Sequence, residues 1–251
     1  MQRVQCLDIG NSSTKFGIYE GKELCNFNHF QTEEIIKKPE LISSKILKED
    51  GNLLYCSVVP AAESSMLNAL SQFSGKIHSI SASFCAGIPI SYKNKSEIGA
   101  DRIANAIAAY YSLPLPAVII DMGTATTFDI ISKEGGYEGG IILPGPQGFL
   151  DYLEKNTALL PKLDLYKESL PELPFGKSTK DAMLIGVFSG YQSMIMGIVE
   201  KLGLFLRQQH SNTPTFTICG GSALDLRLDN CELVENLTLQ GLRIANEIYY
   251  T

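Results

Sequence analysis

Two stretches of the chain share one pattern of hydrophobic and polar positions. In residues 4–19 and again in residues 117–131, an apolar run ends in an Asp-x-Gly turn, and a second extended segment follows. Each pattern predicts two strands joined by a tight turn. Its repetition indicates an internal duplication. At an offset of 113 residues the paired positions are Asp8 with Asp121, Gly10 with Gly123 and Thr14 with Thr127.

Helical periodicity follows the hairpin in both halves of the chain. Apolar residues recur every three or four positions over residues 96–111, 179–209 and 237–249, which predicts three helices. Residues 139–143 and 215–219, which are rich in apolar and β-branched residues, predict further strands. This alternation of strands and helices predicts an α/β fold.

The duplication predicts two domains, an N-terminal one over residues 1–115 and a C-terminal one over residues 116–251. Within the second, residues 182–199 need a membrane check, because these 18 residues carry no formal charge. Three glycines and a polar centre favour a buried helix of a soluble protein instead. We therefore expect no membrane partner.

Composition narrows the function classes further. Of the 251 residues, 45% are hydrophobic and 19% charged, which excludes intrinsic disorder. The net charge of −6 disfavours a non-specific nucleic-acid binder, so we expect no nucleic-acid partner. An anionic ligand would have to meet a few placed cations, backbone N–H groups or a metal ion.

The six cysteines show neither a CxxC pair nor a Cys/His metal spacing. In a chain of this length they predict reduced thiols and a cytoplasmic location. The first residues show no signal-peptide pattern, which favours the same location.

Residues 8–15 combine the residue types of a metal–phosphate site. Asp8 can hold a hydrated Mg²⁺, Gly10 lets backbone N–H groups approach phosphate oxygens, and Lys15 can neutralise charge. The alternative is an ordinary hairpin turn, which uses the same residue types. Residues 121–127 repeat the design with several threonine hydroxyls, and two such turns can close on the phosphates of one nucleotide.

The third candidate motif, residues 97–102, begins the helix predicted in the middle of the chain. Asp101 there can be a general base beside an anion-binding Arg102. The alternative is that Asp101 complements the helix dipole and Arg102 is its solvated partner. Gly220 and Gly221 follow a predicted strand and would allow close approach of an adenine ring.

The sequence is similar to type III pantothenate kinases, within the superfamily that includes actin, hexokinase and sugar kinases. Four motifs carry the resemblance in the family's order: LDIGNSSTKFGI, SYKNKSEIGADRIANAIAAY, VIIDMGTATTFDII and GGIILPG. Sugar kinases do not share the pair GADRI and DMGTATTFD. The resemblance implies two duplicated ribonuclease-H-like domains, with mixed sheets flanked by helices and a nucleotide cleft between them.

The same resemblance implies a reaction and its cofactors. The reaction is ATP-dependent phosphorylation of pantothenate to 4'-phosphopantothenate, the first step of coenzyme A biosynthesis. ATP would be the co-substrate, Mg²⁺ and a monovalent cation (K⁺ or NH₄⁺) the cofactors, and the chain a homodimer.

Roles for individual residues also follow from the resemblance. Asp101 matches the proton acceptor, Asp121 the ligand of the monovalent cation, and Asp8 the water-mediated ligand of Mg²⁺. The ATP-binding residues would be Asp8, Ile9, Gly10, Asn11, Ser12, Ser13, Thr14, Lys15 and Thr124, and the pantothenate-binding residues Tyr92, Gly99, Ala100, Asp101, Arg102 and Thr179.

Three positions depart from the family pattern. Ser12 stands where Thr is usual and keeps the hydroxyl, Lys95 replaces a Pro, and Met122 replaces smaller or aromatic residues and is expected to point into the core. Two other functions stay open. One is a kinase or phosphatase acting on a sugar or polyphosphate, and the other is a non-catalytic relative that binds nucleotide or assists gene regulation.

Overall fold

The structure is a computed structural model that describes residues 3–46, 51–222 and 231–250. Two compact units make up the chain. The first contains Met1–Ala117, Asp129–Gly139 and Asn236–Thr251, and the second contains Val118–Phe128 and Gly140–Glu235. These units differ from the halves inferred from the duplication, and the division at residue 115 stays a prediction.

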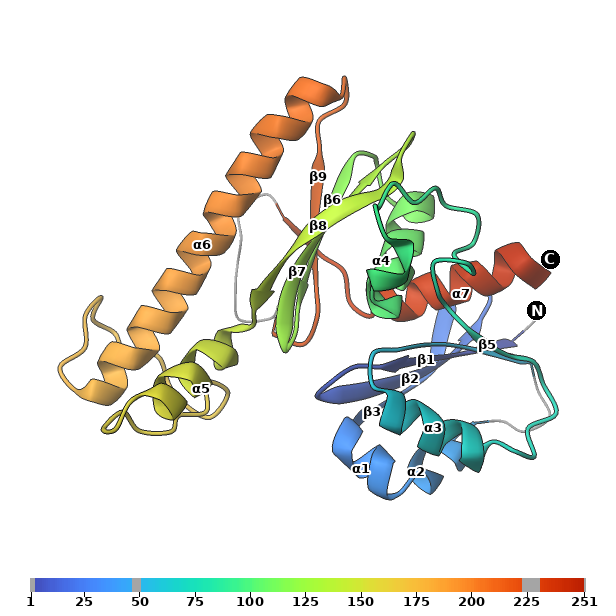
Figure 1. Cartoon of the computed structure of the whole chain (residues 1–251), viewed down its shortest axis with the longest axis horizontal. Helices are drawn as coiled ribbons and strands as arrows, with labels where there is room; N and C mark the ends of the chain where they lie inside the picture. Colours follow the sequence, from blue (N-terminus) through green and yellow to red (C-terminus); the bar gives the residue numbers. More distant parts are fainter. Residues whose placement is uncertain (1–2, 47–50, 223–230, 251) are drawn as a thin grey trace. The chain divides into compact units, whose positions relative to one another are not determined.

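The first unit is built on a mixed five-stranded sheet of order β3-β2-β1-β4-β5 (Figure 1). Strands β1, β2 and β3 are antiparallel neighbours, while β1 pairs with β4, and β4 with β5, in parallel. The strand bounds are β1 Arg3–Ile9, β2 Ser13–Glu20, β3 Glu23–Gln31, β4 Asn52–Ser57 and β5 Ile77–Ser79.

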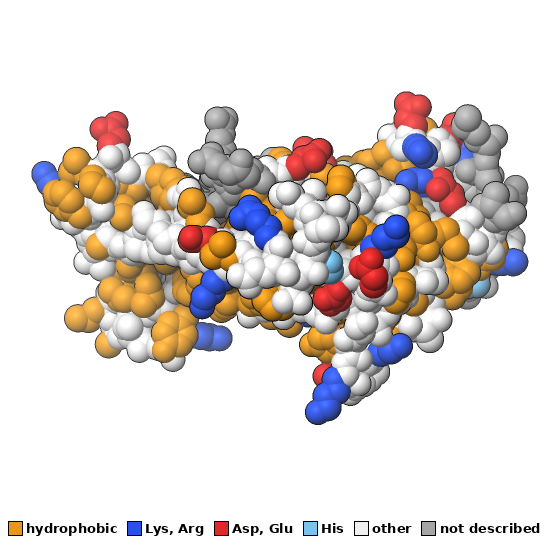
Figure 2. Space-filling model, turned by 90° about the horizontal axis from the view of Figure 1, so that it is seen from above, with side chains coloured by type: hydrophobic (Ala, Val, Ile, Leu, Met, Phe, Trp, Pro, Cys, Tyr) orange, Lys and Arg blue, Asp and Glu red, His pale blue; other side chains and the backbone are white. Residues whose placement is uncertain are grey.

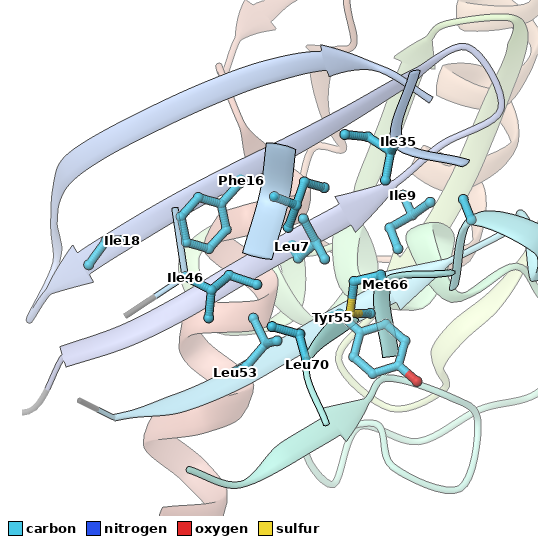
Figure 3. Packing of buried hydrophobic residues seen from close by; sticks show 12 residues of the cluster. Leu7, Ile9, Phe16, Ile18, Ile35, Ile46, Leu53, Tyr55, Met66 and Leu70 are labelled. Carbon is cyan, nitrogen blue, oxygen red and sulfur yellow. The ribbon is translucent and has the colours of Figure 1, made fainter. Parts of the chain in front are cut away.

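One face of this sheet carries the main hydrophobic core. Every second residue of each central strand points into it, as Leu7 and Ile9 do from β1 and Phe16 does from β2 (Figure 3). Three short helices supply the other side of this core. They are α1 Thr32–Lys37, α2 Glu40–Ser43 and α3 Pro60–Ala69.

Helices α4 (Ala100–Ser112) and α7 (Leu237–Tyr250) cover the opposite face of the sheet (Figure 1). The two helices touch closely at a glycine, because a Cβ at Gly241 would lie 1.9 Å from the Ala104 carbonyl oxygen. Leu239 of α7 reaches the sheet beside Gly17. Strand residues that alternate with the core set, including Asp8, therefore face the side on which α4 begins.

A second five-stranded sheet has the order β10-β9-β6-β7-β8. Counted within each sheet, both have the strand order third-second-first-fourth-fifth, which confirms the predicted duplication and the α/β fold class. The bounds are β6 Ala117–Met122, β7 Ala125–Ser132, β8 Gly136–Pro144, β9 Thr215–Cys219 and β10 Glu232–Leu233.

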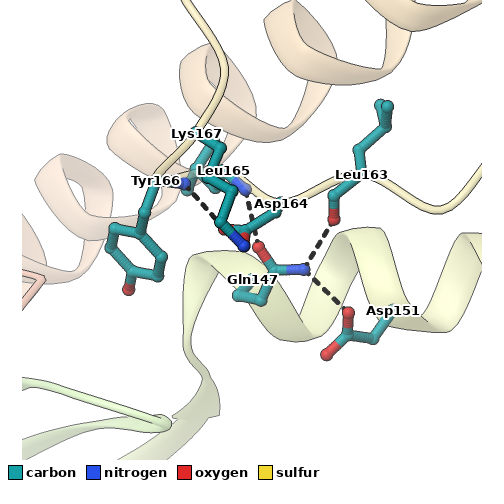
Figure 4. Close-up of polar contacts among 7 residues, drawn as sticks. All are labelled: Gln147, Asp151, Leu163, Asp164, Leu165, Tyr166 and Lys167. Atoms are coloured by element: carbon teal, nitrogen blue, oxygen red, sulfur yellow. Dashed lines mark hydrogen bonds and ion pairs between the residues drawn. The ribbon is translucent and has the colours of Figure 1, made fainter.

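The second unit adds helices α5 (Pro146–Asn156) and α6 (Thr179–Gln209), which pack around Leu150 and Met183. The described segment between them has no helix or strand. The side chain of Gln147 holds it in place: Nε2 donates to the Leu163 carbonyl at 2.9 Å, and Oε1 accepts from the Leu165 N–H at 2.8 Å (Figure 4).

Two predictions about helices need correction. The middle helix starts at Ala100 rather than at residue 96, because Lys95–Glu97 form a separate 3₁₀ turn. Helix α6 has the predicted bounds, but only 28% of its most apolar 18-residue window is buried. The prediction of a buried helix is therefore wrong for the single chain, in which α5, Thr126 of β7 and Phe216 of β9 contact α6 but leave most of that window accessible.

Candidate active site

Asp8 lies at the end of β1, directly between two residues of neighbouring strands. It is paired in register with Lys15 on β2 and with Cys56 on β4. Directly opposed residues of paired strands have Cβ atoms about 5 Å apart. A carboxylate with an ammonium group on one side and a thiol on the other therefore marks this edge of the sheet.

The turn after Asp8 is held by backbone and hydroxyl contacts. The Gly10 N–H donates to the Ser13 carbonyl at 3.0 Å, and the Thr32 N–H donates to the Ser12 carbonyl at 3.1 Å. The Thr32 hydroxyl donates to the Gly10 carbonyl at 2.6 Å and lies 2.9 Å from the Thr14 hydroxyl. The turn is thus rigid before any ligand binds.

The predicted phosphate-binding residues divide by exposure along this hairpin. Ile9 and Thr14 are buried, Asn11 and Ser12 are exposed, and Asp8, Gly10, Ser13 and Lys15 lie between these extremes. The exposed tip and its partly exposed flanks are available to a ligand. Ile9 and Thr14 support the turn from inside.

Cys56 connects Asp8 with the second candidate motif. Its Sγ–H donates to Asp8 Oδ1 at 3.5 Å. Burial raises the pKa of the Cys56 thiol well above its ordinary value, and the negative charges of Asp8 and Asp101 raise it further. The charges of both carboxylates thus act on the pKa of the same thiol. The structure therefore brings Asp8 and Asp101 into one neighbourhood of the first unit.

Asp101 occupies the first turn of α4, with Gly99 as the N-cap residue. Its Oδ1 accepts a hydrogen bond from the Arg102 N–H at 2.8 Å. An added Cβ at Gly99 would lie 2.5 Å from the same oxygen, so a side chain there would displace the carboxylate. The helix N-terminus stabilises the ionised form of Asp101. Gly99 and Ala100 line a cavity of about 670 Å³ together with Ser57 and Ser81.

The side chain of Arg102 is buried, whereas the alternative interpretation of this motif predicted a solvated one. Its side chain is 10% exposed, and Nη2 lies 2.7 Å from Oδ1 of the fully buried Asp129. Burial disfavours the guanidinium charge, but Asp129 outweighs this effect and raises the pKa of Arg102. Removing one partner of such a buried pair costs about 3–5 kcal/mol.

Tyr92 is half-buried on the segment before this motif. Its ring meets that of Tyr137 edge to face, with centroids 5.8 Å apart. An added Cβ at Gly139 would lie 3.8 Å from the Tyr92 ring, so β8 runs beside it. Tyr92, Arg102 and Tyr137 are thereby brought together within the first unit.

In the second unit, Asp121 ends β6 beside two glycines. Gly220 has a φ of +96°, and a Cβ there would lie 2.5 Å from Asp121 Oδ1. The turn after Asp121 is tighter than its counterpart, because the Gly123 N–H donates to the Ala125 carbonyl, two residues on. Thr124 at the tip is exposed, and its carbonyl accepts from the Gly145 N–H at 2.9 Å.

Thr179 is the exposed first residue of α6. It lines an apolar cavity of about 560 Å³ with Tyr152, Met183 and Tyr191. Met122 is fully buried, as predicted. The site residues of the two units form separate sets, and their predicted roles in binding and catalysis stay predictions.

In the described part of the chain, no three His, Cys, Asp or Glu side chains form a metal-binding group. The residues present fit a hydrated Mg²⁺ better than an all-protein metal site, because Mg²⁺ keeps several waters and takes one carboxylate plus phosphate oxygens. The six cysteines are all free thiols, as predicted.

Sequence reasoning missed three residues of this neighbourhood. Cys56 gave no signal, because a cysteine in an apolar strand is normally a core residue. Asp129 did give one, since a carboxylate within the apolar run of residues 127–131 must find a partner. Tyr137 could be found only from its contacts.

Solved structures of similar architecture extend this picture. A Campylobacter jejuni protein whose name assigns it to the Baf family of transcriptional activators aligns over 97% of both chains, with a TM-score of 0.61 and 21% identity. The activator of 2-hydroxyisocaproyl-CoA dehydratase from Clostridium difficile, with bound ADPNP, covers 98% of this chain and is itself covered to 96%, with a TM-score of 0.52 and 15% identity. At these identities the likeness shows the fold alone. The shared fold consists of two five-stranded sheets of the same strand order, each with an Asp-x-Gly turn between its first two strands.

Sequence comparison identifies the family. The family model for type III pantothenate kinase matches residues 5–201. The type III pantothenate kinase of Methylacidiphilum infernorum is 38% identical over 96% of this chain and 87% of its own length. The chain therefore belongs to the type III pantothenate kinase family.

Proposed function

We propose that this chain transfers the γ-phosphoryl group of ATP to the primary hydroxyl of pantothenate, giving 4'-phosphopantothenate in the first step of coenzyme A biosynthesis. The family match over residues 5–201 carries this proposal. The neighbourhood of Asp8 and Asp101 around Cys56 supports it, because it combines a phosphate-type turn with a carboxylate at a helix N-terminus.

Asp101 is the proposed base for the acceptor hydroxyl. A primary alcohol has a pKa far above neutrality, so the carboxylate orients the hydroxyl and accepts its proton late in the transfer. The hydrogen bond from the Arg102 N–H to Oδ1 holds the carboxylate in place at the first turn of α4. Tyr92, Gly99, Ala100, Arg102 and Thr179 are the proposed pantothenate contacts.

Asp8 and its turn are proposed to hold the ATP phosphates. The backbone N–H groups and hydroxyls of residues 10–14 would contact phosphate oxygens, and Lys15 would offset their charge. Bound through water at Asp8, Mg²⁺ would supply electrostatic stabilisation of the phosphoryl group. The chain has a net charge of −6 and would repel two anionic substrates, so such cations are needed to offset this repulsion.

Asp121 is the proposed ligand of a monovalent cation, K⁺ or NH₄⁺, with Thr124 at the ATP. Gly220 supports this assignment, because a side chain there would press on the carboxylate: an added Cβ would lie 2.5 Å from Asp121 Oδ1.

The chain is proposed to act as a homodimer that pairs through α6. This helix has an exposed face with Gly186, Gly190 and Gly197, and a Cβ at any of the three would meet nothing within 4 Å. Figure 2 shows hydrophobic side chains gathered at the end where Figure 1 places α5 and α6. Met196, Leu204 and Phe205, in the second half of α6, are about half exposed. A second copy would cover this surface.

A cytoplasmic location without a membrane partner completes the proposal. Helix α6 is long and apolar enough to span a membrane by length and composition. Its partners at α5 and the buried contact between the Tyr191 and Thr126 hydroxyls instead favour a helix of a soluble enzyme. The proposed dimer gives its exposed face a protein partner.

Release of ADP by the purified chain tests the proposed reaction. We expect release that requires Mg²⁺ and pantothenate, that is faster in K⁺ than in Na⁺, and that sugars and polyphosphate do not support. ADP release with a sugar in place of pantothenate would contradict the proposed acceptor, and indifference to the cation swap would contradict the site at Asp121.

A further inference from the structure

Two fully buried residues connect the acceptor-side residues of the proposed site. Asp129 lies on β7 and Tyr137 on β8, and both are 0% exposed. The Tyr137 hydroxyl donates to Asp129 Oδ1 at 2.9 Å. Arg102 Nε donates to the same oxygen at 2.8 Å. One carboxylate oxygen thus joins two strands to the first turn of α4.

The ring of Tyr137 contacts two of the proposed pantothenate-binding residues. Tyr92 meets it edge to face, with centroids 5.8 Å apart. The Arg102 guanidinium carbon lies 5.7 Å from the centre of the same ring. A shift of the Tyr137 ring would therefore move the surroundings of both residues together.

The backbone of Tyr137 fixes the segment that leads to Tyr92. The Tyr137 N–H donates to the Pro89 carbonyl at 3.0 Å, and the Tyr137 carbonyl accepts from the Ser91 N–H at 2.8 Å. Gly136, at φ +62°, permits this approach, because a Cβ there would lie 2.0 Å from the Pro89 oxygen. The segment before Tyr92 is therefore anchored to β8 by main-chain bonds.

Burial keeps this arrangement in one protonation state. Burial raises the pKa of Tyr137 above its ordinary value, and the adjacent Asp129 raises it further. Its hydroxyl therefore stays a hydrogen-bond donor throughout the neutral range. Arg102 Nη2 is buried and has no hydrogen-bond partner among the described residues, although it lies 2.7 Å from Asp129. The orientation of the guanidinium thus depends on Nε, on Asp129 and on the Tyr137 ring.

We propose that Asp129 and Tyr137 are positioning residues for the acceptor, which hold Arg102 and Tyr92 in the geometry that binds pantothenate. This inference rests on the proposed function, because it takes Arg102 and Tyr92 as pantothenate contacts. Neither residue needs to touch the substrate itself. Their effect belongs to pantothenate binding and not to ATP binding.

The variant Tyr137→Phe tests this role, because it removes only the hydroxyl and keeps the ring against Tyr92 and Arg102. Loss of one hydrogen bond to a buried charged group predicts a rise in the KM for pantothenate of at least about 10-fold. The KM for ATP should stay within about twofold of wild type. Tyr110→Phe is the matched control, since that hydroxyl donates to the Lys133 carbonyl, outside the network.

Calorimetric titration with pantothenate provides a second measurement that does not need turnover. We expect Tyr137→Phe to weaken pantothenate binding by the same factor, and Tyr110→Phe to leave it unchanged. Asp129→Asn, which keeps the shape but removes the charge, should weaken binding more. Combining Tyr137→Phe with Arg102→Lys should weaken binding by less than the product of the two separate effects, because both act through one contact.

Three results would overturn the inference. The first is an unchanged KM for pantothenate in Tyr137→Phe, and the second is a rise of this KM in Tyr110→Phe as large as in Tyr137→Phe. The third is an equal rise of the KM values for pantothenate and for ATP in Tyr137→Phe, which would indicate a merely structural role. Failure of the proposed function itself looks different, because wild-type protein would then release no ADP in response to pantothenate.

Discussion

At the scale of single residues, Asp101 carries the chemical step of this account. Asp101→Asn keeps the size of the side chain and its hydrogen bond from the Arg102 N–H but removes the base. Turnover should fall by at least about 10²-fold while the affinity for ATP stays nearly unchanged. Steady-state kinetics with a separate ATP titration would measure both.

A matched control separates this effect from a general loss of negative charge. Glu97 is exposed and lies four residues before Asp101. Glu97→Gln should keep near-normal turnover. Near-normal turnover of Asp101→Asn would exclude Asp101 as the base.

The second prediction at this scale concerns the thiol beside Asp8. Burial, followed by the charges of Asp8 and Asp101, raises the pKa of Cys56 well above its ordinary value. The thiol should therefore stay protonated and unreactive at pH 8, because alkylating agents attack the thiolate. Exposed Cys25 is the internal comparison.

Peptide mass spectrometry after iodoacetamide treatment of the folded protein checks this. We expect labelling of Cys25 and protection of Cys56 until the protein is unfolded in guanidinium. Equal labelling of both cysteines in the folded protein would show that Cys56 is accessible and that its thiol does not face Asp8 from the interior.

At the scale of elements, the second Asp-x-Gly turn depends on the glycine that follows β9. Gly220→Ala would force a φ of +96° on a residue with a side chain and place its Cβ 2.4 Å from the Met122 carbonyl. The strain predicts a loss of about 1–3 kcal/mol in the free energy of unfolding, together with weaker activation by K⁺.

The neighbouring glycine offers the control for this prediction. A Cβ at Gly221 would meet nothing within 4 Å. Gly221→Ala should change stability by no more than about 0.5 kcal/mol and leave K⁺ activation intact. Thermal denaturation and assays in K⁺ and Na⁺ measure the two effects, and equal behaviour of both variants would argue against close contact of Gly220 with Asp121.

Many of the helices and strands could be predicted from the sequence. The bounds of α6 and β9 could be predicted, because the long helical periodicity of α6 and the alternation of Thr with Phe and Ile in β9 are clear local patterns. Strands β3 and β4 and helices α1 to α3 were not assigned. β3 alternates weakly, and six of its nine residues are exposed at the sheet edge. The ion pair of Arg102 with Asp129 joins residues far apart in sequence, which periodicity cannot reveal.

At the scale of the whole molecule, the exposed glycines of α6 predict how the chain assembles. Because a Cβ at Gly197 would meet nothing within 4 Å, Gly197→Ala should stabilise the single chain by up to about 1 kcal/mol through helix propensity. Gly197→Leu should also be tolerated by the single chain. Its bulk would prevent close contact of two α6 helices.

Analytical ultracentrifugation distinguishes these outcomes. Wild-type protein and Gly197→Ala should sediment mainly as dimers, and Gly197→Leu as a monomer with an unchanged circular dichroism spectrum. A dimer that persists in Gly197→Leu would place the interface elsewhere than on this face of α6. A monomeric wild-type protein would exclude the proposed dimer.

The identity of the phosphorylated product decides whether this chain phosphorylates pantothenate. Purified protein is incubated with ATP, Mg²⁺, K⁺ and pantothenate, and the products are analysed by mass spectrometry and ³¹P NMR. The account predicts ADP and an equal amount of pantothenate carrying one phosphoryl group on its primary hydroxyl. ADP without a phosphorylated pantothenate, or no consumption of ATP, would contradict it.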